Sequence, residues 1–296
     1  MSLCNICPRK CNVDRKNGYG FCQSGDSMKI SRIAPHFFEE PPISGKNGSG
    51  TVFFSGCNLR CVFCQNKEIS RSSSLGKEYS HTELIDALVK LQELGVHNIN
   101  LVTPTHYSST VAVVLEEMKK KGLLLVPVVY NSSGYESLDS LKRLDGLVDI
   151  YLPDLKYFSS ELSAKYSFAP DYFTVASSAI LEMLRQRGKY RYNDSDPSLL
   201  ASGVIIRHLV LPSHRKDSID LLERLASLLD PSDVLISIMS QYTPEFALDT
   251  PYPELHRKIT SFEYRSVCDK ADSLGFDGFT QARSSASSVY TPDFES

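Results

Sequence analysis

Three cysteines within eight residues constrain this chain more than any other feature of its sequence. Cys57, Cys61 and Cys64 have the spacing C-x3-C-x2-C and directly follow an apolar run at residues 51–56. Three thiolates are one fewer than a closed tetrahedral zinc site or a fully ligated iron–sulfur cluster requires. Because α/β folds place their chemistry in loops at strand ends, this spacing predicts a cluster that leaves one iron open for a substrate or cofactor.

The alternative for these three thiols is a structural zinc site that a distant fourth ligand completes. Four further cysteines lie upstream and could supply that ligand. We favour the open cluster, because structural zinc pairs usually have the spacing C-x2-C on a knuckle. Such a knuckle would not need the strand, the glycine and the following helix that the sequence predicts around this loop.

The first 50 residues contain the second cysteine group, with the spacing C-x2-C-x3-C-x10-C at Cys4, Cys7, Cys11 and Cys22. Four thiolates make a closed ligand set, so we predict a metal-binding module. A structural zinc ion is the first interpretation and an auxiliary iron–sulfur cluster the second, followed by a vacant site or a role in electron entry. Residues 30–50, which are rich in proline and glycine, are predicted to be a linker with a few extended residues.

The composition is that of an ordinary globular chain. The 296 residues are 42% hydrophobic and carry a net charge of -3, which allows one large α/β core and is not typical of a nucleic-acid binder. The start of the sequence has no apolar signal segment, and no run is long enough to cross a bilayer. Seven of the eight cysteines lie at short spacings in the first quarter. We therefore predict reduced thiols and a cytoplasmic location, with Cys268 as a small core residue of a helix.

From residue 51 onward, short apolar runs alternate with amphipathic segments. The runs predict strands at 51–55, 99–102, 123–129, 147–152, 204–211 and 234–239, and the amphipathic segments predict helices at 82–94, 110–121 and 218–229. Such alternation predicts a parallel sheet covered by helices. Right-handed crossovers would curl this sheet into a partial (β/α)6 barrel, and a flat doubly wound sheet is the alternative. The predicted domains are a module and linker at 1–50, the barrel core at 51–245 and a C-terminal closing segment at 246–296.

Polar residues recur at the carboxyl ends of these strands, where a parallel sheet builds its site. They are Thr103, Pro104, Thr105 and His106 after the second strand, Asn131, Ser132 and Ser133 after the third, Asp154 and Lys156 after the fourth, and Arg207 and His208 around the fifth. Unpaired charges beside apolar runs are unfavourable, so Asp154, Lys156 and Arg207 should have partners. The alternative to a binding site is a set of internal salt bridges at the barrel rim.

The cysteine loop, with Phe63 directly before the third cysteine, resembles the signature of the radical S-adenosylmethionine (radical SAM) enzymes. More narrowly, the chain resembles iron–sulfur proteins related to the pyruvate formate-lyase activating enzymes, in the segments CNICPRKC, CNLRCVFCQN, NLVTPTHY, VYNSSGYE, LPDLKY, IIRHLVLP and SQYTP. The resemblance implies a [4Fe-4S] cluster on Cys57, Cys61 and Cys64. The fourth iron of this cluster would bind the amino and carboxylate groups of S-adenosylmethionine, with Phe63 beside the adenine.

The resemblance also implies roles for the strand-end residues. Residues 103–105 stand where many radical SAM enzymes have a Gly-Gly-Glu turn against the methionine amino group, although this chain lacks the glutamate. Asn131 and Ser132 match an Asp-Thr-Asn-Gly loop, and Asp154 and Lys156 match an Asp-Leu-Lys motif; both motifs border the cofactor's carboxylate and ribose. Arg207, also expected to bind the cofactor, matches an arginine of the fifth strand. Asn131 replaces an aspartate of the activating enzymes, which removes one negative charge.

The function that the resemblance implies is reductive cleavage of S-adenosylmethionine to methionine and a 5'-deoxyadenosyl radical. The electron would come from a donor such as flavodoxin or ferredoxin, and the expected partner is a glycyl radical enzyme. Two alternatives stay open. One is a radical SAM enzyme that modifies a small molecule or peptide, and the other is an iron–sulfur or zinc scaffold without catalytic activity.

Overall fold

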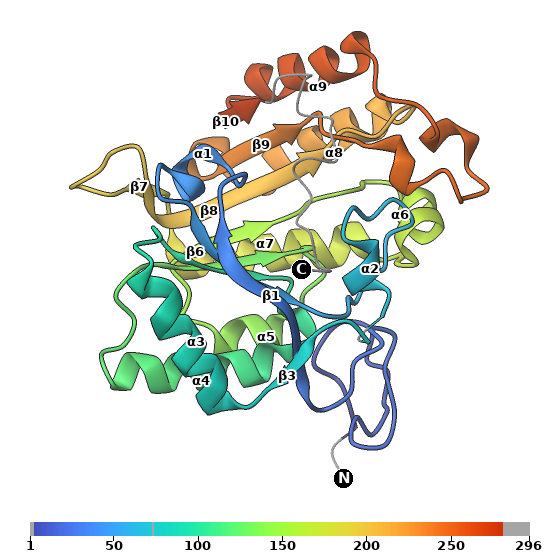
Figure 1. Cartoon of the computed structure of the whole chain (residues 1–296). Coiled ribbons are helices and arrows are strands. Elements are labelled where there is room, and N and C mark those ends of the chain that lie inside the picture. The colour runs from blue at the N-terminus through green and yellow to red at the C-terminus, as the bar shows by residue number, and fades with distance from the viewer. Residues whose placement is uncertain (1–2, 73, 281–296) are drawn as a thin grey trace.

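We describe residues 3–72 and 74–280 in a computed structural model of the chain (Figure 1). Its strands are β1 (Met28–His36), β2 (Ser49–Phe54), β3 (Lys77–Tyr79), β4 (Ile99–Val102), β5 (Val128–Ser132), β6 (Ile150–Pro153), β7 (Arg191–Tyr192), β8 (Leu200–Leu209), β9 (Leu235–Met239) and β10 (Asp277–Thr280). Its helices are α1 (Pro41–Ser44), α2 (Lys67–Ser70), α3 (His81–Glu93), α4 (Ser108–Lys120), α5 (Leu138–Arg143), α6 (Ser160–Ser167), α7 (Tyr172–Arg187), α8 (Arg215–Ala226) and α9 (Ser261–Ser273).

One sheet runs through the described residues in the order β10-β9-β8-β6-β5-β4-β2-β1-β3, with β7 paired to β8. All neighbours from β2 to β10 along this path are parallel, whereas β1 pairs with β2 and β3 in antiparallel fashion. The sheet is not closed, because β3 and β10 form its two ends. This arrangement confirms the predicted α/β class and the partial barrel.

All six predicted strands occur, but the bounds of the third were wrong. The prediction was 123–129, whereas β5 is Val128–Ser132 and continues into polar residues. Leu125 is 78% exposed, so the apolar run before Pro127 lies outside the sheet. The strand instead extends through Asn131 because an inward position near the end of a strand can carry a polar side chain that faces a cavity. A seventh parallel strand, β10, falls in the segment predicted to close the barrel.

The prediction of a linker over residues 30–50 was also wrong. Residues Met28–His36 form the nine-residue strand β1, and Pro41–Ser44 form the short helix α1. The pairing with β2 supplies the hydrogen bonds of β1, which its mixed polar and apolar sequence did not reveal. The sheet therefore crosses both predicted domain boundaries. These boundaries stay a prediction, and residues 281–296 of the predicted closing segment lie outside the described residues.

Inside the barrel, the side chains form two stacked layers, because every second residue of a strand points inward. The lower layer is apolar, and we call it the inner apolar layer; its residues are Ile43, Val129, Ile150, Leu152, Leu200, Ile205 and Leu235. Two residues further along three of these strands, the same inward positions carry Asn131, Arg207 and Ser237. Ile43 belongs to α1 and is fully buried. The segment that was predicted to be a linker thus buries Ile43 in the barrel. This side chain completes the inner apolar layer, which lies beneath Asn131, Arg207 and Ser237.

The outward positions of the strands pack against the helices in a larger core. Tyr130, Tyr151 and Ile236 belong to this core together with Leu115 of α4 and Ile180 of α7. The first predicted helix, 82–94, begins one residue earlier in the structure, at His81, because the side chains of Ser80 and Glu83 form a capping box. Cys268 lies in α9, as predicted. In the described part of the chain, no helix is long and apolar enough to span a membrane.

Candidate functional site

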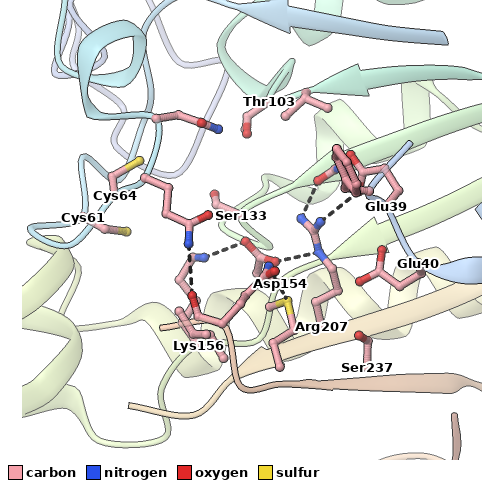
Figure 2. A pocket seen from close by; sticks show the side chains of 18 of the residues that line it. Glu39, Glu40, Cys61, Cys64, Thr103, Ser133, Asp154, Lys156, Arg207 and Ser237 are labelled. Carbon is pink, nitrogen blue, oxygen red and sulfur yellow. Dashed lines mark hydrogen bonds and ion pairs between the residues drawn. The ribbon is translucent and has the colours of Figure 1, made fainter. Parts of the chain in front are cut away.

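A cavity of about 340 Å³ opens inside the barrel near the carboxyl ends of the parallel strands. Nine of the predicted site residues line it: Cys57, Cys61, Phe63, Cys64, Thr103, Asn131, Asp154, Lys156 and Arg207. Figure 2 shows Asp154, Lys156 and Arg207 between the cysteines on one side and Glu39 and Glu40 on the other. Residues predicted from separate strand ends are therefore brought together in one cavity.

The three thiols of the cysteine loop each accept a hydrogen bond. The sulfur of Cys61 accepts one from the Ser167 hydroxyl at 2.9 Å, and that of Cys64 accepts one from the Ser70 hydroxyl at 3.4 Å. The sulfur of Cys57 accepts one from the backbone N–H of Leu59 at 3.4 Å. Such donors stabilise thiolate ligands and tune the cluster that they hold. The donor set therefore fits an iron–sulfur cluster with three protein ligands.

Burial opposes ionisation of these thiols when no metal is bound. It raises the pKa of Cys57 to about 12, and the neighbouring Cys61 and Cys64 add to the shift. A bound cluster would displace these protons. In residues 3–72 and 74–280, no three His, Cys, Asp or Glu side chains are arranged to hold a single metal ion. The metal at each cysteine group stays a prediction.

A buried ion pair lies at the centre of the cavity. The Arg207 Nε donates to Asp154 Oδ1 at 2.9 Å, and the Lys156 Nζ donates to Asp154 Oδ2 at 2.6 Å. A further Arg207 nitrogen, Nη2, donates to the side-chain oxygen of Asn131 at 2.5 Å. Burial alone would raise the pKa of Asp154, but the two cations outweigh it and hold this pKa below its usual range. The charged strand-end residues thus have the partners that the sequence led us to expect.

Three predicted cofactor residues, Pro104, Thr105 and Ser132, do not line the cavity. The hydroxyl of Thr105 donates to the carboxylate of Glu136, which is buried beside the barrel. The hydroxyl of Ser132 accepts from the backbone N–H of Gly134 at 3.2 Å. Of the turn that was predicted to meet the methionine amino group, only Thr103 lines the cavity.

The two histidines among the strand-end residues are buried and bonded to backbone oxygens. His106 Nε2 lies 2.8 Å from the carbonyl oxygen of Ser55, and His208 Nδ1 lies 2.7 Å from that of Leu155. Burial lowers the pKa of both histidines to about 4. They are therefore neutral near pH 7, and neither lines the cavity.

Glu136 gives a prediction about the pH dependence of stability. Burial raises its pKa from 4.5 to about 7. The neutral carboxyl group therefore stabilises the fold below pH 4.5, and this contribution is lost as the pH rises through about 7. The loss in the free energy of unfolding is at most about 3 kcal/mol. Glu136→Gln cannot titrate. Between about pH 5 and pH 8, the free energy of unfolding of this variant should therefore rise relative to that of the wild type.

Urea unfolding of both proteins across this range measures the difference. His106 and His208, whose folded pKa values are lowered, contribute stability that increases with pH, but they do so in both proteins and cancel. Parallel pH profiles for the variant and the wild type would contradict the prediction.

The sequence missed several cavity residues. They are His36, Phe38, Glu39, Glu40, Gln65, Ser237, Gln241 and Phe279, among others. Ser237 could have been found, because it is the one polar residue in the run LISIM of β9. It is paired in register with Arg207 of β8. Glu39 and Glu40 carried no such signal, since they lie between prolines in a segment that we expected to be a linker.

The N-terminal cysteine module packs directly on the loop of Cys57, Cys61 and Cys64. The Arg9 side chain donates to the carbonyl oxygens of Asn58 at 2.8 Å and Ser167 at 2.9 Å. A side chain on Gly56, whose φ is +92°, would place its Cβ 2.6 Å from the carbonyl oxygen of Cys22. Only glycine allows this close approach between the two cysteine groups.

Four thiols on irregular loops are expected to order only around a metal. Changing Cys4 and Cys7 to serine should therefore release about one metal equivalent and expose residues 3–27 to proteases. Metal analysis and limited proteolysis of the wild type and the variant measure both effects, and the metal content identifies zinc or iron. Unchanged protease resistance would show that the bound metal is not structural.

Residues 51–194 match the family description "Radical SAM superfamily", a range that begins in β2 and includes the three cysteines of the loop. The chain contains a radical SAM domain. Radical SAM enzymes use a [4Fe-4S] cluster and S-adenosylmethionine, and the match supports these cofactors and an enzyme of that general kind.

Similarity to other proteins extends beyond residues 51–194. An uncharacterized protein of Methanocaldococcus jannaschii is 28% identical over 283 residues, which cover 93% of this chain and 75% of that protein. A radical SAM methyltransferase from Sphaerobacter thermophilus superposes with a TM-score of 0.51 at 14% identity, over 78% of this chain and 65% of the other. Streptococcus suis SuiB bound to S-adenosylmethionine superposes with a TM-score of 0.50 at 12% identity, over 76% of this chain and 48% of SuiB. These two likenesses show the radical SAM fold.

Proposed function

We propose that this protein cleaves S-adenosylmethionine at a cluster held by Cys57, Cys61 and Cys64, and directs the resulting radical at a substrate in the same cavity. The observation that carries the proposal is that the three thiols share this cavity with Asp154, Lys156 and Arg207. When bound, the cluster supplies the electron that breaks the carbon–sulfur bond of S-adenosylmethionine.

The residues of this chain would bind and orient the cofactor. Phe63 is 7% exposed and packs edge-on against Tyr157 and Tyr242, with ring centroids 6.5 Å and 6.0 Å away. It offers an apolar wall to the adenine. Burial raises the pKa of the Cys61 thiol, and the positive charge of Lys156 opposes part of this increase. This charge would favour the thiolate there and attract the cofactor's carboxylate.

The proposed activity predicts that the reduced protein forms 5'-deoxyadenosine from S-adenosylmethionine, slowly, even without a substrate. Anaerobically reconstituted protein would be reduced with dithionite, and 5'-deoxyadenosine and methionine would be measured by mass spectrometry. Cys268→Ala is the matched control, because this cysteine lies in α9 outside both groups and should not affect the yield. No product above background in the wild type would refute the function.

Two targets for the radical have support. The sequence resemblance to the activating enzymes supports a glycyl radical enzyme, with flavodoxin or ferredoxin as the electron donor. The cavity supports a small molecule or peptide instead, and we favour this target. A backbone glycine brings no charge, whereas the cavity contains the buried carboxyl groups of Glu39 and Glu40. A glycyl radical signal on a partner enzyme after incubation with this protein and S-adenosylmethionine would decide for the first target.

A further inference from the structure

Glu39 and Glu40, which we call the floor pair, project into the barrel from the segment between β1 and α1 (Figure 2). The side chain of Glu39 is 9% exposed. Its carboxylate accepts from Asn100 Nδ2 at 3.0 Å, from Asn131 Nδ2 at 3.4 Å and from Arg207 Nη1 at 3.4 Å. Glu39 is therefore held in place by neighbours on β4, β5 and β8.

Glu40 is buried without a full set of partners. It is 7% exposed and lines the cavity, yet its Oε2 atom has no hydrogen-bond partner. The hydroxyl of Ser237 donates a hydrogen bond to the Glu40 carboxyl group. Among the described residues, no cation lies within ion-pair distance of Glu40. The side-chain oxygen of Asn100, which contacts Glu39 through its nitrogen, is also buried and unpaired. Buried acceptors of this kind are rare and point to a missing donor.

The charges that line the cavity do not balance. Glu39, Glu40 and Asp154 supply three carboxyl groups, against the two permanent cations Lys156 and Arg207. Burial lowers the pKa of the remaining basic group, His36, so that it adds no charge near pH 7. Asp154 already uses Lys156 and Arg207 at 2.6 Å and 2.9 Å. Burial raises the pKa of Glu39 and Glu40 in the empty cavity, so a cation bound beside the unpaired oxygen of Glu40 would allow both carboxyl groups to ionise.

We propose that the floor pair binds the positively charged end of the substrate, a primary ammonium group on an apolar stem. An ammonium group has three donors, and the unpaired oxygen of Glu40 and a carboxylate oxygen of Glu39 would accept two of them. The inference rests on the proposed function, because it assigns the substrate class of that cavity. Charge-assisted hydrogen bonds to a buried carboxylate are among the stronger polar contacts in proteins.

The walls around the floor pair favour an organic cation over a metal ion. His36, Phe38, Phe53 and Phe279 line the same cavity and present ring surfaces that an alkyl stem or an ammonium group can contact. The guanidinium of Arg207 lies 3.4 Å from Glu39 and would repel a divalent ion more strongly than a singly charged ammonium group. Divalent oxygen sites also need more ligands than the two carboxylates found here.

The test uses the full chain, anaerobically reconstituted and kept oxidised, in titration calorimetry with three probes of similar shape. Pentylamine should bind, whereas neutral pentanol and anionic pentanoate should bind at least about tenfold more weakly or not at all. Glu40→Gln should weaken pentylamine binding by about tenfold or more, since the amide keeps the shape and removes the charge. Glu116→Gln is the matched control, because Glu116 is exposed on α4. The affinity of this variant for pentylamine should equal that of the wild type.

Several results would overturn the proposal. The wild type could fail to bind pentylamine, or it could bind pentanol equally well. The Glu40→Gln variant could bind pentylamine with wild-type affinity. Magnesium ions could bind in place of pentylamine, with an affinity that depends on Glu40. The probe series on the wild type decides the matter even if the variant is unstable, which a thermal unfolding curve would reveal. Failure of the proposed function is distinguishable, because 5'-deoxyadenosine formation by the wild type is measured without any amine.

Discussion

Replacing Cys57, Cys61 and Cys64 together with alanine is expected to remove the iron–sulfur cluster of the cavity and to reduce 5'-deoxyadenosine formation to background. The loss should be complete, because the three thiols are the proposed protein ligands and the open iron is where S-adenosylmethionine would bind. The N-terminal module should keep its metal. Iron and sulfide analysis, together with the electron paramagnetic resonance signal of the reduced protein, would measure the cluster.

The triple variant should stay folded, because other contacts hold the loop. Leu59 is fully buried, the backbone N–H of Val62 donates to the carbonyl oxygen of Tyr166 at 2.9 Å, and Arg9 donates to Asn58. A matching variant in the N-terminal module, with Cys4 and Cys7 changed to serine, should lose the other metal and retain the cluster signal. Zinc alone in both the wild type and the triple variant would rule out the radical SAM chemistry proposed for this loop.

Arg207→Ala is expected to lower the free energy of unfolding by about 3–5 kcal/mol, because removal of one partner leaves buried charges uncompensated. Arg207 is the partner of Asp154 at 2.9 Å and of Glu39 at 3.4 Å, and its side chain is only 15% exposed. Lys156 would remain as the cation beside Asp154. Urea unfolding at neutral pH measures the loss.

The sign of the pH effect follows from Asp154. Its folded pKa lies below the unfolded value of 3.8, so its stabilising contribution is present above that pH and is lost as the pH falls through the folded pKa. Arg207→Ala should raise this pKa and shift acid unfolding to higher pH. A profile that is the same in the variant and the wild type would contradict the pairing.

The same residues test the cofactor proposal. Asp154→Asn and Arg207→Ala should both weaken formation of 5'-deoxyadenosine while the cluster remains, since neither residue supplies a thiolate. Loss of the cluster in the Arg207 variant would mean that the ion pair mainly holds the fold. Unchanged 5'-deoxyadenosine formation in both variants would mean that S-adenosylmethionine uses other residues of the cavity.

The parallel sheet and the centre of the site could be predicted from the sequence because they leave local signals. Buried strands give apolar runs, and charged residues such as Asp154 and Arg207 stand out beside them. The fixed direction of parallel strands then brings these residues to one edge. Asn131 is an exception, because a polar residue is not expected inside a buried strand and the end of β5 was therefore predicted wrongly. Its polar side chain is accommodated there because it faces the cavity.

The segment from β1 to α1 could not be predicted for a different reason. Its strand is stabilised by pairing with β2, its helix has only four residues, and Ile43 is buried by contacts with strands distant in sequence. No periodic pattern records such contacts. Glu39 and Glu40 therefore looked like loop acids, and only their burial and their neighbours identify them as part of the site.

Strand β1 connects the N-terminal cysteine module to the floor pair through the chain itself. It begins directly after the N-terminal cysteine module and runs along β2 (Figure 1). It ends three residues before Glu39. We therefore expect a metal that orders the module to order also the strand that leads to the floor pair. Thermodynamic linkage makes any such coupling reciprocal. A chelator that removes this metal should weaken the binding of pentylamine, and bound pentylamine should slow the loss of the metal by making the same strand more rigid.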